Sequence, residues 1–152
     1  MKKFIVLTLL VFGGIYASAQ SAKPAYDAAL AKSLGADEYG MKMYVLAILK
    51  SGTNKTDNKA VLDSLFRGHM ANIGRLAANG KLVVAGPIEK NDKAYRGIFI
   101  FNVKTIAEAN ALLVTDPAIN GKVLDAELYQ WYGSAALPVY LDTHKKIEKT
   151  QH

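Results

Sequence analysis

Residues 81–103 have the sequence KLVVAGPIEKNDKAYRGIFIFNV, and their pattern is the main clue to the topology. Two short runs rich in β-branched and aromatic residues, Lys81 to Ala85 and Tyr95 to Val103, are predicted strands. Gly86-Pro87 ends the first run, because proline has no N–H with which to continue a hydrogen-bonded ladder. The polar residues between the runs form a loop. The chain therefore contains two consecutive strands with no helix between them.

The residues before this stretch predict a strand followed by a helix. Met43 to Leu49 is a short apolar run closed by Lys50-Ser51-Gly52, which is typical of a strand. Apolar residues then recur at steps of three and four until Gly80, the stop signal, so one face of a helix is buried. The residues predicted on that face are Leu62, Leu65, Phe66, His69, Ile73, Leu76 and Ala77, whereas Asp63, Arg67, Asn72 and Arg75 are predicted to lie elsewhere.

The residues after it predict a second helix and a final strand. Thr105-Ile106-Ala107-Glu108 is a capping box that opens the helix, and Thr115-Asp116-Pro117 ends it, since the residue before a proline disfavours helical backbone. The last strand spans about Leu124 to Tyr132. The order strand, helix, strand, strand, helix, strand predicts a ferredoxin-like α+β fold, a four-stranded antiparallel sheet with two helices on one face.

One face of the predicted sheet has no helix to cover it. In the strand from Tyr95 to Val103, Ile98 and Ile100 point away from the side that carries Gly97, Phe99, Phe101 and Val103. The first strand is likewise apolar on both sides. An exposed apolar face is normally an interaction surface, so a second copy of the chain or the C-terminal tail is expected to cover it, and a homodimer is predicted.

The first 19 residues are typical of a secretory signal peptide. Lys2 and Lys3 precede an apolar run from Phe4 to Tyr16, and Ala17-Ser18-Ala19 supplies the small residues that a signal peptidase recognises. An uncleaved membrane anchor is the alternative, but this run is shorter than the roughly 20 residues that a spanning helix needs. Cleavage before Gln20 is expected, which makes the mature protein periplasmic or secreted, with no stable membrane anchor.

One domain remains after cleavage. We divide the 152 residues into a signal peptide (1–19), an N-terminal arm (20–42), an α+β domain (43–132) and a C-terminal tail (133–152).

The absence of cysteine excludes disulfides and thiol catalysis. Cleavage would lower the net charge from +6 to +4, spread along the chain, so no nucleic-acid partner is expected. No phosphate-binding glycine loop or HExxH motif occurs, and neither a cofactor nor a metal is expected.

Several motifs together resemble the YCII-related family of small dimeric α+β-barrel proteins. They are Arg67-Gly68-His69-Met70, the NGKLVVAGP stretch at 79–87, Ala107-Glu108-Ala109 and Thr115-Asp116-Pro117, and the resemblance covers about Tyr44 to Trp131. It implies a His/Asp pair in a pocket formed by sheet and helices, which transfers to His69 and Asp116. One member type removes chloride from a hydroxylated aromatic ring, so the resemblance implies a lyase- or isomerase-like activity. The signal peptide, the arm and the tail depart from the usual member.

His69 and Asp116 are the candidate catalytic residues. A carboxylate bonded to one imidazole nitrogen fixes the tautomer and stabilises the imidazolium, so such a pair can take up or deliver a proton near neutral pH. A core histidine and a turn-forming aspartate are the alternative interpretation. Two functions therefore stay open: an enzyme that performs acid/base chemistry on a small organic molecule, and a noncatalytic small-ligand-binding or interaction protein on the same scaffold.

Three further groups have a weaker claim to a ligand site. Arg67 and Arg96 could hold an anionic substrate, although surface charges are the favoured interpretation. His144 could fold back over the pocket, although a solvated tail is favoured. A cluster of aromatic residues on the closing strand is expected to pack in the core rather than to line a cavity, and it comprises Tyr129, Trp131 and Tyr132.

Overall fold

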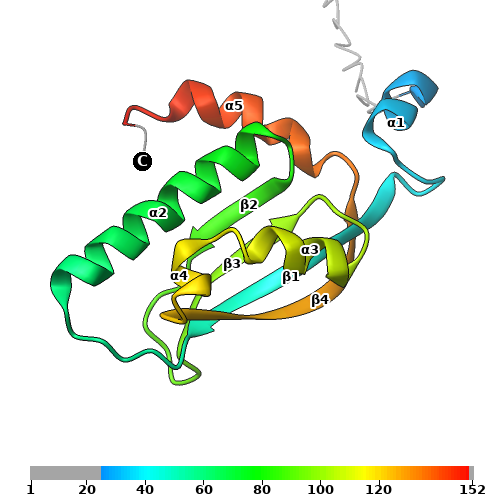
Figure 1. Ribbon diagram of the computed structural model, residues 1–152. Coiled ribbons are helices and arrows are strands. Elements are labelled where there is room, and N and C mark those ends of the chain that lie inside the picture. The colour runs from blue at the N-terminus through cyan, green and yellow to red at the C-terminus, as the bar shows by residue number, and fades with distance from the viewer. Residues whose placement is uncertain (1–24, 151–152) are drawn as a thin grey trace, which may run out of the picture.

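The computed structural model describes residues 25–150, so the predicted signal peptide and its cleavage site lie outside the described residues. The domain runs through β1 (Met41–Ser51), α2 (Lys59–Ala78), β2 (Leu82–Pro87), β3 (Tyr95–Phe101), α3 (Ile106–Leu113), α4 (Pro117–Asn120) and β4 (Leu124–Ser134). A short helix, α1 (Ala28–Leu34), precedes it, and a 3-10 turn, η1 (Leu137–Val139), and α5 (Tyr140–Ile147) follow it (Figure 1).

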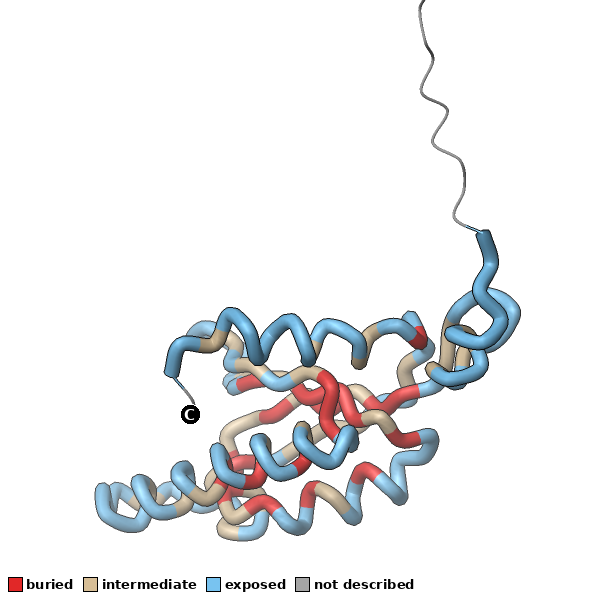
Figure 2. Tube along the Cα trace, turned by 90° about the horizontal axis from the view of Figure 1, so that it is seen from above, coloured by how far each residue is buried: buried red, intermediate tan, exposed pale blue. Residues whose placement is uncertain are grey.

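The four strands form one antiparallel sheet in the order β2-β3-β1-β4. This order, with α2 connecting β1 to β2 and α3 and α4 connecting β3 to β4, is ferredoxin-like and confirms the predicted fold class. The helices α2, α3 and α4 lie in front of the sheet in Figure 1. Figure 2 shows the buried residues concentrated between the layers, with the outer sides of the helices exposed.

The larger core lies between the sheet and its covering helices. Alternate residues of the two central strands supply its floor, as the sequence predicted: Val45, Ala47 and Leu49 from β1, Phe99 and Phe101 from β3. The covering helices, the two outer strands and the segment after β3 supply the rest of this buried cluster: Leu76, Leu82, Val103, Ala109, Leu113, Ala118 and Leu124.

A smaller apolar cluster lies on the opposite face of the sheet. Tyr44, Val83 and Ile100 are buried there, and Leu137 from the tail packs against them. The tail therefore covers part of this face. Farther along it, Leu46 and Ile48 are only half-buried, and Tyr129 is 49% exposed.

Several strand ends differ from those predicted. β2 continues through Pro87, because β2 lies at the edge of the sheet, where a residue without an N–H removes no ladder bond. β1 and β4 each extend two residues beyond the predicted domain boundaries at 43 and 132, since they pair with each other from Met41 opposite Ser134 to Ser51 opposite Leu124. Val103 lies beyond the end of β3 but remains in the core.

Two β-bulges interrupt the pairing of β3. Leu82 pairs with Phe101 and Val84 with Ile100, so Val83 is an extra residue in β2. A bulge leaves the extra residue outside the ladder. The second bulge lies between β1 and β3, at Arg96, and is described with the site.

The C-terminal tail forms a hydrogen bond with the extra residue of the first bulge. The Tyr140 hydroxyl donates a hydrogen bond to the Val83 carbonyl and so joins α5 to the edge of the sheet. The tail is thus held against the sheet at this point, although most of α5, His144 included, is exposed, as expected of a solvated tail. Sequence patterning could not show this bond, because it joins residues 57 positions apart in the chain.

Gly52 should tolerate no side chain. A Cβ there would lie 2.1 Å from the Lys122 carbonyl oxygen, which is backbone and cannot rotate away. We expect Gly52→Ala to destabilise the protein by about 1 to 3 kcal/mol, the usual cost of overpacking. Gly74→Ala is the matched control, because nothing lies within 4 Å of its Cβ position and alanine favours a helix. Urea unfolding of both variants tests this, and equal stability of the two would contradict it.

Candidate functional site

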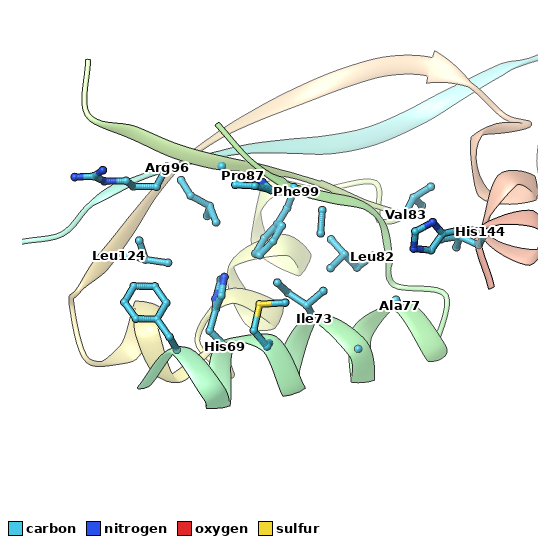
Figure 3. A pocket seen from close by; sticks show the side chains of 18 of the residues that line it. His69, Ile73, Ala77, Leu82, Val83, Pro87, Arg96, Phe99, Leu124 and His144 are labelled. Carbon is cyan, nitrogen blue, oxygen red and sulfur yellow. The ribbon is translucent and has the colours of Figure 1, made fainter. Parts of the chain in front are cut away.

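His69 lies in the middle of α2 and points toward the sheet (Figure 3). The helix begins after Asn58, whose side chain accepts hydrogen bonds from the backbone N–H groups of residues 60 and 61. The imidazole stacks on Phe99 of β3, with ring centroids 5.8 Å apart and planes 24° apart, and meets the edge of Phe66 at 6.1 Å. Only 8% of His69 is exposed. The predicted helix face therefore buries this histidine between two aromatic rings.

Asp116 is fully buried and is the N-cap of α4. One carboxylate oxygen, Oδ1, accepts hydrogen bonds from the backbone N–H groups of Ala118 (2.9 Å) and Ile119 (3.4 Å). The other, Oδ2, lies 2.7 Å from Nδ1 of His69. The structure thus brings together the two residues singled out in the sequence, and the turn-forming role proposed as an alternative for Asp116 is present as well.

A glycine allows α4 to approach α2 closely enough for this contact. A Cβ at Gly68, the residue before His69, would lie 2.7 Å from Cγ of Pro117, the residue after Asp116. Close packing of the two helices is therefore possible only with a minimal side chain at this position, and it places the histidine and the aspartate opposite each other.

The surroundings of Asp116 favour its ionised form. Burial is the largest single influence and by itself raises the pKa, but the hydrogen bond and charge of His69, with the N–H groups of Ala118 and Ile119, outweigh it and hold the pKa of Asp116 below its ordinary value. An ionised carboxylate only accepts hydrogen bonds, so Nδ1 of His69 is the donor in this pair.

This assignment leaves Nε2 of His69 free to act as a base. In the neutral imidazole a proton on Nδ1 leaves a lone pair on Nε2. Among residues 25–150 no hydrogen bond involves Nε2, and no buried side-chain nitrogen or oxygen lacks a partner. Nε2 is therefore reached by solvent, through the cavity that His69 lines.

That cavity has a volume of about 1220 Å³ and lies between α2, the β2–β3 side of the sheet and α5. Figure 3 shows Arg96 and Leu124 at one end, Val83 and His144 at the other, and His69 near the first end. Most of the walls are apolar, and they include Leu49, Phe66, Met70, Ile73, Ala77, Leu82, Phe99 and Leu124. The cavity is large enough for a small organic molecule, which it would enclose mainly in apolar surface.

Three polar residues behind the pair were not predicted as part of the site. Asn72 is buried, contrary to the predicted helix pattern, and its Nδ2 lies 3.5 Å from Oδ2 of Asp116. Its Oδ1 accepts a hydrogen bond from Nη2 of Arg75 at 2.6 Å and lies 3.0 Å from Oγ1 of Thr115. The spacing of Asn72 three residues after His69 was the available signal, because residues three apart share a helix face.

The other candidates occupy different places. Arg96 and Arg67 are both exposed, as the surface interpretation expects, but Arg96 also lines the cavity, whereas Arg67 lies outside the lining. His144 lines the far end and does fold back toward the pocket. Of the three aromatic residues on β4, only Trp131 packs inward, against Tyr44 at 5.7 Å on the other face of the sheet, while Tyr129 and Tyr132 remain about half exposed.

Neither a metal site nor a membrane-spanning helix occurs in the described part of the chain. Within residues 25–150, no three His, Asp or Glu side chains converge so that they could hold a metal ion. No helix in this same range is both long and apolar enough to cross a membrane.

Comparison with known proteins finds similarity among solved structures. No protein-family model matches the chain. No curated protein matches it either. Among solved structures, the chain is similar to 5-chloro-2-hydroxyhydroquinone dehydrochlorinase (TftG) from Burkholderia phenoliruptrix AC1100, in complex with 2,5-dihydroxybenzoquinone, at 19% identity and a TM-score of 0.41, over 57% of this chain and 92% of that one. The YCII-related resemblance therefore rests on the sequence motifs.

The low pKa of Asp116 predicts a loss of stability in acid. Because the folded state depresses this pKa, the ionised carboxylate stabilises the fold fully above the unfolded pKa of about 3.9, and the contribution disappears as the pH falls through the lower folded value. We expect the gap in unfolding free energy between wild type and Asp116→Asn to shrink below about pH 4. Urea titrations at pH 7, 4 and 3 measure it, and a gap that is constant with pH would contradict the prediction.

Proposed function

We propose that this chain is an exported, YCII-like protein that performs acid/base chemistry on a small organic molecule, with His69 and Asp116 as its reacting pair. One observation carries the proposal: a buried, ionised carboxylate lies 2.7 Å from Nδ1 of His69, while Nε2 of the same ring faces a large apolar cavity. A purely structural histidine would have no need of both the carboxylate and the open cavity.

Export rests on the composition of residues 1–19, and intact-mass analysis of the exported protein, expected to begin at Gln20, tests it.

The geometry supports proton transfer at one atom. Nε2 takes a proton from an acidic C–H or O–H of the bound molecule, and the Asp116 carboxylate stabilises the imidazolium that forms. The imidazolium then returns the proton either to another atom of the same molecule, which gives an isomerase-like reaction, or to a leaving group, which gives a lyase-like one. A bound molecule would displace the solvent that reaches Nε2, and the apolar walls would then strengthen the interaction of the ring with Asp116.

Isotope exchange tests the proposal without knowledge of the natural substrate. Small organic compounds with acidic C–H groups are incubated with the protein in D₂O, and NMR measures how fast deuterium replaces hydrogen. Wild type should accelerate exchange in at least one class of compound, and His69→Ala should not. His144→Ala is the matched control, since His144 lines the same cavity but pairs with no carboxylate among residues 25–150. Compounds that bind without any accelerated exchange would favour the noncatalytic ligand-binding alternative.

We also propose that two copies of the chain associate through the sheet face opposite α2. This face carries Leu46 and Ile48 half-buried and Tyr129 exposed, and the tail packs only against its Tyr44 end. Apolar surface of this kind is stabilised when it is removed from water, and a second copy would bury it.

Ile48→Lys should convert such a dimer into a monomer. The new ammonium group would lie opposite Glu127 of β4 in the isolated chain, so the fold should survive, but a buried interface would leave the charge poorly solvated. Light scattering at micromolar concentration measures the mass. Val114→Lys, an exposed position outside this face, is the control and should leave the dimer intact. A monomeric wild type would contradict the proposal.

A further inference from the structure

Arg96 owes its position in the cavity to a β-bulge. Leu49 of β1 pairs with Gly97, but the next residue of β1, Lys50, pairs with Tyr95, so Arg96 is the extra residue of β3. Regular alternation from Phe99 and Gly97 would put Arg96 on the face away from α2. Bulges redirect side chains, and here Nε of Arg96 donates a hydrogen bond of 2.7 Å to Oγ of Ser51, which also lines the cavity.

The guanidinium has no acidic partner in the described part of the chain. The ion pairs there join Lys50 to Glu127, Lys59 to Asp63, His69 to Asp116 and Lys145 to Asp142. Arg96 is exposed and thus presents its charge at the solvent-facing rim of the cavity, at the end nearer to His69. Among residues 25–150 its side chain bonds only to neutral Ser51, which leaves both Nη groups available. The far end differs, because Lys145 is already paired and Glu148 adds a negative charge to the lining.

We propose that Arg96 is the anion-binding residue of this cavity and that the molecule bound there is a small organic carboxylate with an apolar body. A planar guanidinium binds a carboxylate through two parallel hydrogen bonds, which fixes the orientation of the ligand as well as its charge. The apolar body then lies along Leu124, Phe99 and Phe66, beside the imidazole of His69. The inference rests on the proposed function for the role of His69, and it adds the substrate class.

Benzoate and benzamide are the probes that test this assignment, because they have the same shape and differ in charge at neutral pH. Their dissociation constants are measured by ¹H–¹⁵N NMR titration of the whole chain at low salt. We expect wild type to bind benzoate about tenfold or more tightly than benzamide, as one charge-assisted hydrogen-bonded contact provides. Equal affinities in wild type would overturn the proposal, whatever the variants do.

Two variants test whether Arg96 supplies the positive charge that binds benzoate. Arg96→Gln should abolish the preference for benzoate, and Arg67→Gln, which removes the same charge from a position outside the cavity lining, should keep it. A preference that survives Arg96→Gln would overturn the assignment. Failure of the proposed chemistry is distinguishable, because His69→Gln should lose isotope exchange but still prefer benzoate: exchange that is unchanged in His69→Gln refutes the proton transfer and leaves benzoate binding at Arg96 to be judged by itself.

Discussion

His69→Gln should lower the rate of proton transfer by about two to four orders of magnitude, the range typical of a positioned acid/base group. Glutamine roughly keeps the shape of the side chain and can still hydrogen-bond to Asp116, but it has no nitrogen that takes up a proton near neutral pH. Stability should therefore change little. The measurement is the isotope-exchange rate of the best compound from the screen, taken together with the unfolding free energy of the same sample.

The two measurements separate catalysis from packing. If His69 served only to fill the space between Phe66 and Phe99, truncation to alanine would mainly cost stability, on the order of 1 to 3 kcal/mol for the hydrogen-bonding partner left behind, and glutamine would be almost harmless to the exchange rate. An exchange rate in His69→Gln equal to that of wild type would eliminate the pair as the reacting group.

Asp116→Ala should produce the largest loss of stability, about 3 to 5 kcal/mol. The substitution leaves the Nδ1–H of His69 without its buried acceptor. Removing one partner of a buried pair destabilises a protein strongly, because the other partner stays buried without compensation. It also removes the cap that accepts from the backbone N–H groups of Ala118 and Ile119. Urea unfolding gives the size of the effect, and a loss below about 1 kcal/mol would show that Asp116 does not hold these elements together.

Asp116→Asn is the companion variant that isolates the chemistry. Asparagine is a good N-cap, so the start of α4 should survive with a smaller loss of stability. Its amide NH₂, however, can donate to Nδ1 of His69, which moves the ring proton to Nε2 and removes the lone pair from the cavity side. We expect the exchange rate to fall by at least about two orders of magnitude, and a wild-type rate in this variant would refute the orienting role of the carboxylate.

The pairing of His69 with Asp116 could be predicted from sequence because the motifs around both residues resemble those of the YCII-related family. His69 fell on the apolar stripe of a long helix, and Asp116 stood before a proline at the end of the next helix. Their contact, by contrast, depends on the missing side chain of Gly68, which allows α4 to lie against α2. Neighbouring motifs indicated the pair, but only the packing of the two helices explains it.

The residues that were missed depend on relations between distant segments. Asn72 was placed off the buried face because only apolar residues were counted, although it is paired with Asp116 through the fold. Arg96 was expected at the surface, where the structure leaves it exposed, but its place at the rim of the cavity depends on a bulge, and a bulge is defined by the register against β1, 45 residues away at Ser51. The sequence of one strand does not show how that strand pairs with its neighbour. The place of the Arg96 charge beside the cavity could therefore not be predicted.

The bond between Tyr140 and the Val83 carbonyl has a consequence for the solubility of the protein. A bare outer strand offers its free backbone groups to any other extended chain, and this is a common route to aggregation. Here α5 is fastened to β2, and Pro87 removes a donor from the same strand, so strand addition on that side is blocked. The last helix of the described residues, which contributes no buried residue of its own, thus protects the β2 edge of the sheet.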